Sequence, residues 1–249
     1  MRVSPASAAR GYPDFGLLTM SEMVDNAAVM ARAISVPLIA DTGYGNEINV
    51  TRTVREYEAR SVAAIHIEDQ VAPRRCGHLD GKLVISREEF VSKIRAAVEA
   101  RRTKEFLIIA RTDARAMMDL DEAVWRANAA MDASADMAFV EARRKRARKS
   151  PPCRSGCTAP ACSMSYRAAA HRSLICARPK RWARKLAILP GLMLKAVIEA
   201  GDGALAEIKA TFIAPSVNRS DAKTFRRFGA DEWDALRTRF NAVSTMEGR

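Results

Sequence analysis

Residues 106–113 read FLIIARTD, a short apolar run that ends in polar and charged residues. The run is too short for a typical helix, and its nearly continuous apolar character is typical of a parallel strand that is buried on both faces. Four other segments have the same form, and we expect a strand in each of them: VPLIAD (36–41), VAAIHIED (62–69), DMAFVEA (136–142) and KLAILPG (185–191).

The segments between these runs carry apolar residues at helical spacing. Thr19 and Glu22 have the spacing of a capping box, in which each side chain bonds the other residue's backbone amide. Ser86 and Glu89 repeat this spacing. We predict helices at 19–34, 86–100, 121–131, 192–208 and 224–240, the last with Trp233, Leu236 and Phe240 on one face.

Strands that alternate with helices over 249 residues favour a (β/α)8 barrel of the TIM type, which typically takes about 250 residues. We therefore predict an α/β fold in which residues 1–249 form a single barrel domain with C-terminal helices. The alternative is an open doubly wound sheet, which usually has a glycine-rich phosphate loop after its first strand. Residues 43–47 (GYGNE) lack that fingerprint, so the barrel is favoured.

The composition indicates a protein with a substantial core. Hydrophobic residues make up 48% of the chain, and no run of 18 or more apolar residues occurs, so we expect no membrane span. The first 15 residues contain no apolar stretch of signal-peptide length, which predicts a cytoplasmic protein.

The net charge of +12 comes from one segment. Residues 143–184 contain thirteen Lys or Arg and no Asp or Glu, whereas the rest of the chain is close to neutral. The same segment holds four of the five cysteines and has little periodicity. This composition is typical of a GC-rich coding region translated in the wrong frame, so we interpret the segment as the product of a compensated frameshift.

Two functional interpretations of this segment are alternatives. Zinc could bind its cysteines and one histidine, but their spacing forms no paired CxxC motif: Cys153, Cys157, Cys162, His171 and Cys176. The run RRKRARK (143–149) could bind nucleic-acid phosphates. Since only Tyr166 and Trp182 could stack on bases there, we do not expect a nucleic-acid partner.

Charged residues stand at the ends of the predicted strands, where the loops of a barrel form its active site. They are Asp41, Glu68 with Asp69, Arg111 with Asp113, and Glu141. Carboxylates from neighbouring strands suit a hard divalent cation, so the pattern predicts a Mg²⁺ site that is held partly through water. The alternative for any one acid is that it caps the following helix.

Four motifs in order carry a family resemblance. DTGYGN (41–46), HIEDQ with RRCGH (66–78), LIIARTDA (107–114) and FVEA (139–142) are similar to motifs of the isocitrate lyase and phosphoenolpyruvate mutase superfamily. The pattern is nearest to lyases of 2-methylisocitrate and substituted malates and to carboxyphosphonoenolpyruvate phosphonomutase-like proteins. The resemblance implies a Mg²⁺-dependent barrel, with Mn²⁺ as an alternative ion, and a tetramer in which subunits exchange a C-terminal helix.

The resemblance also implies roles for individual residues. Asp41, Glu68 and Asp14 resemble metal-site carboxylates, and Glu141 resembles a carboxylate of the active-site rim. Arg111 resembles the arginine that neutralises oxyanion charge. Residues 42–45 resemble the family's loop that lines the 2-oxo acid end of the substrate, and they are Thr42, Gly43, Tyr44 and Gly45.

Residues 74–78 resemble the loop whose cysteine moves a proton in the lyases, which implies that role for Cys76. Positive charge on Arg74, Arg75 and His78 favours the thiolate form of Cys76, which suits proton exchange. Gly77 and Arg75 are expected to contact substrate. Mutases usually lack a cysteine here, so Cys76 favours the lyase branch.

We therefore expect a carbon–carbon lyase that splits a 2-hydroxy di- or tricarboxylate into a 2-oxo acid and a second carboxylate. Oxaloacetate decarboxylation or phosphonate mutase chemistry at the same site is an alternative, and a non-catalytic, frameshift-damaged remnant is another. Three departures from the family pattern motivate the last: a missing first βα unit, a DTGYG motif that lacks two residues and one carboxylate, and an altered region of the seventh strand.

Overall fold

In a computed structural model of the protein, the described residues are 5–42, 45–71, 83–141, 161–164, 184–188, 191–216 and 220–244. The chain forms two compact units, Met1–Lys195 and Ala196–Arg249. The assignment of both to one barrel domain stays a prediction.

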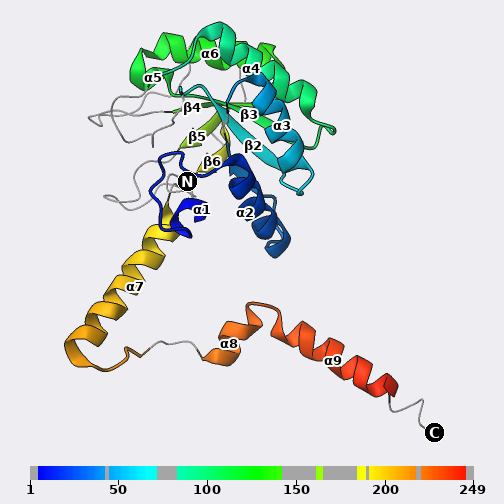
Figure 1. The fold of residues 1–249 in the computed structure, drawn as a ribbon, viewed down its shortest axis with the longest axis vertical. Helices are drawn as coiled ribbons and strands as arrows, with labels where there is room; N and C mark the ends of the chain where they lie inside the picture. Colours follow the sequence, from blue (N-terminus) through cyan, green and yellow to red (C-terminus); the bar gives the residue numbers. More distant parts are fainter. Residues whose placement is uncertain are drawn as a thin grey trace. The chain divides into compact units, whose positions relative to one another are not determined.

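The described part of the first unit contains a sheet of six parallel strands that are neighbours in chain order (Figure 1). The strands are β1 (Ile39–Asp41), β2 (Ala64–Glu68), β3 (Leu107–Thr112), β4 (Met137–Val140), β5 (Ala161–Met164) and β6 (Arg184–Ile188). Five of them are the predicted strands, and they confirm the α/β class. A parallel strand needs a crossover from its neighbour, and in the described residues α3, α4, and α5 with α6 lie in the connections between β1, β2, β3 and β4.

Strand β5 was not predicted, because residues 143–184 show little apolar periodicity. Its backbone pairs with β4 at Ala161 and Cys162 and with β6 from Ala161 to Met164. Strand pairing here depends on backbone groups, which every residue except proline supplies, so a weak side-chain pattern does not prevent it.

Four of the five predicted helices are present, those at 19–34, 86–100, 121–131 and 192–208, and the described residues form other helices as well. The helices are α1 (Pro5–Ala8), α2 (Met20–Ala33), α3 (Glu47–Glu58), α4 (Arg87–Ala100), α5 (Ala114–Met117), α6 (Leu120–Asp132), α7 (Leu192–Thr211), α8 (Asp221–Arg226) and α9 (Ala230–Ser244). The capping box of Thr19 and Glu22 forms at the start of α2. The side chain of Ser86 accepts a hydrogen bond from the amide of Glu89 at the start of α4.

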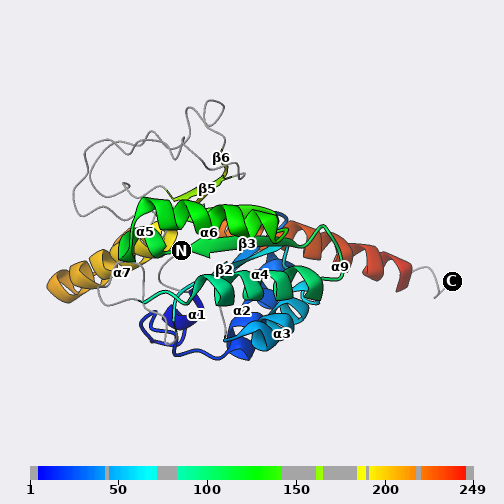
Figure 2. The same ribbon diagram turned by 90° about the horizontal axis from the view of Figure 1, so that it is seen from above.

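Alternate residues of the strands pack on opposite faces of the sheet. Ile65, Ile67 and Ile108 belong to the large core cluster that β2 and β3 form with helices. Ile109 and Phe139 belong to a second cluster on the other face. Figures 1 and 2 show α4 and α6 next to β3, on the face of the first cluster. Burial of both faces explains the nearly continuous apolar runs of the sequence.

The turns that lead from α3 into β2 and from α6 into β4 have the same construction. Ser61 and Ser134 have φ values of 60° and 69°, in the left-handed region. The amides of Val62 and Ala135 bond the carbonyls of Tyr57 and Ala130, which closes the last turn of each helix. This is the Schellman pattern, and its recurrence shows that the chain repeats one helix–strand unit.

In the second unit, the predicted helix 224–240 is divided into α8 and α9. Gly229 separates them with a φ of 83°, a conformation that other residues adopt rarely. Trp233 and Phe240 on α9 are exposed, with 71% and 65% of their surface accessible. None of the described helices is long and apolar enough to cross a membrane.

Candidate active site

The guanidinium of Arg111, on β3, lies among four carboxylates at the carboxyl ends of the strands. Its Nη1 is 3.1 Å from Glu68 Oε2 and 3.7 Å from Asp41 Oδ2. Its Nη2 is 3.0 Å from Asp113 Oδ2 and 3.8 Å from Glu141 Oε2. Glu68 is paired with Arg111 in the register of β2 and β3, and this pairing places the two side chains next to each other.

This cluster is almost completely buried. The side chains of Arg111, Glu68, Asp113 and Glu141 are 4% exposed or less, whereas that of Asp41 is 39% exposed. Burial by itself lowers the pKa of Arg111, but the charges of the four carboxylates outweigh it and raise the pKa. Arg111 therefore stays protonated, and this one cation is shared by four carboxyl groups.

Asp69 joins the ends of β2 and β3 on the opposite face of the sheet. It accepts hydrogen bonds from Thr112 Oγ1, at 2.6 Å, and from the amide of Asp113, at 2.9 Å. Burial raises the pKa of Asp69, against the lowering effect of these hydrogen bonds. The consecutive acids of the HIED motif thus have separate partners, because successive strand residues point to opposite faces.

Gln70 belongs to the same face as Glu68 and is buried. Its Nε2 lies 3.5 Å from Glu68 Oε2 and 3.3 Å from Asp113 Oδ2. The amide thus donates to carboxylates at the ends of two neighbouring strands, which orients both of them.

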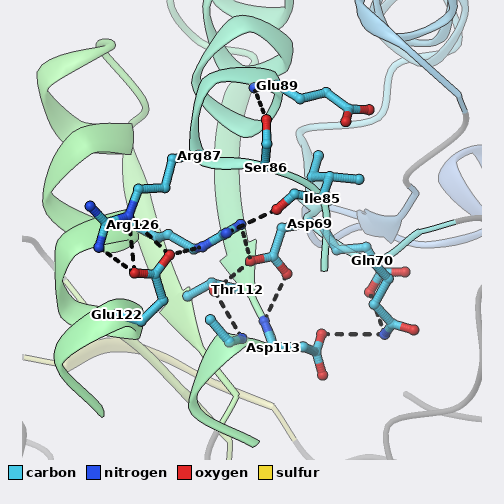
Figure 3. Close-up of polar contacts among 12 residues, drawn as sticks. Asp69, Gln70, Ile85, Ser86, Arg87, Glu89, Thr112, Asp113, Glu122 and Arg126 are labelled. Atoms are coloured by element: carbon cyan, nitrogen blue, oxygen red, sulfur yellow. Dashed lines mark hydrogen bonds and ion pairs between the residues drawn. The ribbon is translucent and has the colours of Figure 1, made fainter. Parts of the chain in front are cut away.

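A second arginine, Arg126 on α6, contacts Asp69 from the helix side (Figure 3). Its Nη1 is 3.2 Å from Asp69 Oδ2, and its Nε is 2.8 Å from Oε1 of Glu122. Arg87, on α4, pairs with the same Glu122 and lies over the ring of Trp125. These contacts connect α4 and α6 to the strand end that carries the site.

The structure brings four of the predicted site residues together: Asp41, Glu68, Arg111 and Glu141. Asp14 lies partly buried in the loop before α2, and its assignment to the metal stays a prediction. Thr42 is buried at the end of β1, where its hydroxyl donates to the carbonyl of His66 at 2.8 Å.

Gly45 lies in the turn before α3, with a φ of 67°. A Cβ at this position would lie 2.3 Å from Nδ2 of Asn49, so the turn requires glycine. The other predicted site residues lie outside the described part of the chain, and their roles stay predictions: Gly43, Tyr44, Arg75, Cys76, Gly77 and His78. The candidate zinc ligands Cys153, Cys157, His171 and Cys176 lie outside it as well.

The carboxylate oxygens at the strand ends are ligands that a hard cation prefers. In the described part of the chain, no three His, Cys, Asp or Glu side chains are grouped so that they alone could hold a metal ion. Mg²⁺ usually retains several waters and takes only one or two carboxylates from the protein. Asp41 and Glu68, whose oxygens both approach Nη1 of Arg111, fit that requirement.

Sequence reasoning missed several residues that support the site. Gln70, Lys93, Glu122 and Arg126 are all buried, although their types are usually exposed. Lys93 Nζ donates to the backbone carbonyl of Glu68 at 3.3 Å. The only sequence feature that could have indicated them is the position of Lys93 and Arg126 on the apolar faces of their helices.

Comparison with known proteins identifies the family. The family model described as phosphoenolpyruvate phosphomutase matches residues 4–153. The chain therefore belongs to this family, within the isocitrate lyase and phosphoenolpyruvate mutase superfamily, as the motifs predicted.

Two relatives with extensive identity are lyases. The chain is similar to 2,3-dimethylmalate lyase of Eubacterium barkeri, with 53% identity over 133 residues, which are 53% of this chain and 46% of that protein. It is also 53% identical to 2-methylisocitrate lyase of Aeropyrum pernix over 132 residues, 52% of this chain and 42% of that protein. The matched part of the chain thus spans less than half the length of either relative.

Solved structures agree over most of the chain. A crystal structure of 2,3-dimethylmalate lyase has a TM-score of 0.81 and 32% identity, covering 95% of this chain and 80% of that one. Oxaloacetate acetylhydrolase in complex with 3,3-difluorooxalacetate has a TM-score of 0.82 and 30% identity, covering 98% and 84%. The fold is thus the TIM-type α/β barrel of this superfamily.

We predict that Arg111→Met lowers the free energy of unfolding by about 3–5 kcal/mol, because it leaves buried carboxylates without their cation. Urea denaturation at neutral pH measures the change. Arg115→Met, on the neighbouring helix α5, is the control and should change stability by less than about 0.5 kcal/mol. Equal effects of the two substitutions would show that the cluster does not depend on the charge of Arg111.

We predict that the contribution of Glu122 to stability depends on pH. Hydrogen bonds from Arg87 and then Arg126 lower the pKa of Glu122, against the effect of burial. A lowered pKa in the folded state contributes stability above the usual carboxyl pKa of about 4.3, and this contribution is lost as the pH falls through the folded value.

Glu122→Gln should therefore destabilise the protein by about 2 kcal/mol at pH 7. The difference from the wild type should shrink as urea denaturation is repeated at decreasing pH. Glu99→Gln, at an exposed position of α4, is the matched control and should change little at any pH. A difference that is the same at every pH would contradict the assigned charge pairing.

Proposed function

We propose that this chain is a divalent-cation-dependent carbon–carbon lyase that splits a 2-hydroxy di- or tricarboxylate into a 2-oxo acid and a second carboxylate. One observation carries the proposal: a buried, protonated Arg111 lies among carboxylates from four consecutive strand ends. This edge of a barrel is where its enzymes bind substrate. The 53% identity to 2,3-dimethylmalate lyase over 133 residues supports the class of reaction.

A further cation would favour substrate binding at this site. With all four carboxyl groups ionised, the cluster would carry three excess negative charges, and each would repel a unit charge of a polycarboxylate substrate at 4 Å by about 1–4 kcal/mol. Asp41 and Glu68 would hold the cation, with Asp14 as a further carboxylate. Mg²⁺, or Mn²⁺ in its place, would supply positive charge that polarises the hydroxyl and carboxylate of the substrate.

The chain's own residues would complete the reaction. The bond between the hydroxyl-bearing carbon and its neighbour breaks, the hydroxyl loses its proton to a base, and the released carbanion gains a proton. Arg111 remains a cation and stabilises the oxyanion, while Cys76, assisted by His78, supplies the proton. Glu141, whose Oε2 lies 3.8 Å from Nη2 of Arg111, would help to orient that side chain. The residues that would bind the substrate's carboxylates are Gly43, Tyr44, Gly45, Arg75 and Gly77, whereas the hydroxyl and the amide of Thr42 both donate to the carbonyl of His66.

An alternative reaction at the same site has support from the solved structures. Oxaloacetate acetylhydrolase is similar to this chain over 98% of its length. That similarity favours oxaloacetate as a second candidate substrate. Cleavage of oxaloacetate by water gives oxalate and acetate, whereas decarboxylation gives pyruvate, so the products distinguish the two reactions.

We further propose that the enzyme is a cytoplasmic homo-oligomer, a tetramer whose subunits exchange a C-terminal helix. The apolar side chains of the second unit support this proposal, since most of their surface is exposed in a single chain: Val197, Leu205, Phe212, Phe228, Trp233 and Phe240. Exposed apolar surface of this kind typically belongs to an interface.

The test is to incubate the purified chain with Mg²⁺ and 2-methylisocitrate, 2,3-dimethylmalate or oxaloacetate, and to identify every product. We expect pyruvate with a second carboxylate from one of the first two substrates, and loss of turnover after the cation is removed by a chelator. Cys76→Ser should lower kcat by about 10²–10⁴-fold, the range for loss of a general acid.

The control is Cys157→Ser, which should leave turnover unchanged. Turnover that is unaffected by Cys76→Ser would refute the role of this thiol alone. A folded chain that converts none of the substrates with Mg²⁺ or Mn²⁺ would refute the proposed function and would favour a non-catalytic remnant.

A further inference from the structure

Arg126 is a buried arginine on the helix side of the sheet whose role lies outside the chemistry proposed above. It is 2% exposed, and each of its three nitrogens donates to a different acceptor. Nε bonds Glu122 Oε1 at 2.8 Å, Nη1 bonds Asp69 Oδ2 at 3.2 Å, and Nη2 bonds the carbonyl of Ile85 at 2.9 Å. Such a planar fork with three fixed partners has very little freedom to move.

The acceptors of Arg126 connect it to the site at two places. Asp69 also accepts hydrogen bonds from the hydroxyl of Thr112, the last residue of β3, and from the amide of Asp113, the residue after it. The position of Asp69 therefore determines how the end of β3 lies against the end of β2. Glu68, which pairs with Arg111, directly precedes Asp69 in the chain.

The second place is the backbone of residues 83–85. The amide of Ile85 donates to the carbonyl of Asp69 at 2.9 Å, and the amide of Val71 donates to the carbonyl of Leu83 at 2.9 Å. Gln70 forms an antiparallel bridge with Val84 between them. Residues 69–71 and 83–85 thus run side by side, and Arg126 bonds both sides of this pair, as Figure 3 shows for Asp69 and Ile85.

We propose that Arg126 is a positioning residue: by holding Asp69 and the carbonyl of Ile85 together, it fixes the ends of β2 and β3 and thereby the approach of Glu68 to Arg111. Without Arg126, Asp69 is a buried carboxylate that lacks its cation, and the carbonyl of Ile85 loses a donor. Both groups then shift toward water or toward new partners, since buried polar groups without partners are costly. The consequence for catalysis rests on the proposed function, whereas the consequence for the backbone does not.

A matched control exists in the same network. Arg87 bonds Glu122, as Arg126 does, but among the described residues it donates to neither Asp69 nor Ile85. Its side chain is 46% exposed. Arg87→Gln therefore removes an arginine from Glu122 while the connection to the strand ends stays in place.

The experiment compares backbone hydrogen exchange in the wild type, Arg126→Gln, Arg126→Lys and Arg87→Gln, at a temperature well below unfolding. We expect the amides of Ile85 and Asp113 to exchange at least about tenfold faster in Arg126→Gln than in Arg87→Gln, because both donate to Asp69. Arg126→Lys keeps a charge near Asp69 but cannot reach three acceptors, so it should lie between. If Arg126→Gln does not fold, Arg126→Lys decides by the same comparison.

Turnover is measured on the same variants. Arg126→Gln should lower kcat by about 10–100-fold with a smaller change in KM, because misplacement of reacting groups affects the chemical step. Arg87→Gln should keep kcat. Exchange at Ile85 and Asp113 that is the same in both variants would overturn the proposal, as would a kcat that falls only in proportion to the unfolded fraction. A wild type without turnover would refute the proposed function, and the exchange comparison would still decide the role of Arg126.

Discussion

The constraint on which the rest of the structure depends is the pairing of two buried arginines with two consecutive acids. Glu68 points to one face of the sheet and pairs with Arg111, and Asp69 points to the other face and pairs with Arg126. A strand that ends in two adjacent carboxylates requires a cation on each side, because an unpaired buried charge costs several kcal/mol. The loss of either arginine leaves an acid at the same strand end without compensation.

The two faces of the sheet differ in their balance of charge. We place the proposed reaction on the face of Arg111 and the support of the strand ends on the face of Arg126. Around Arg111, four carboxylates share one cation, an arrangement that is suited to bind a further cation. On the helix side, Asp69 and Glu122 are balanced by Arg126 and Arg87, which leaves no excess charge in that group. Carboxylates that are matched by arginines keep each other in fixed positions, whereas carboxylates in excess over arginines can bind a further cation.

The strand ends could be predicted from the sequence because they depend on a local pattern. Apolar runs that end in Asp, Glu or Arg identify β1 to β4 and place Asp41, Glu68, Arg111 and Glu141 at one edge of the sheet. The contacts of Gln70 and Arg126 could not be predicted, because their partners Asp113 and Asp69 lie 43 and 57 residues away in the chain. The apolar face of α6 indicates that Arg126 is buried, but it does not identify the acid that pairs with it. Strand β5 was missed for a related reason: it depends on backbone pairing with its neighbours, and its own residues show little pattern.

The most direct test of this account is a double-mutant cycle between Glu68 and Arg111, measured as free energies of unfolding for the wild type, Glu68→Gln, Arg111→Met and the double variant. The account predicts a coupling free energy of about 2 kcal/mol or more, because each residue compensates the buried charge of the other. Effects of the two substitutions that add within about 0.5 kcal/mol would contradict it, since independent sites behave in that way.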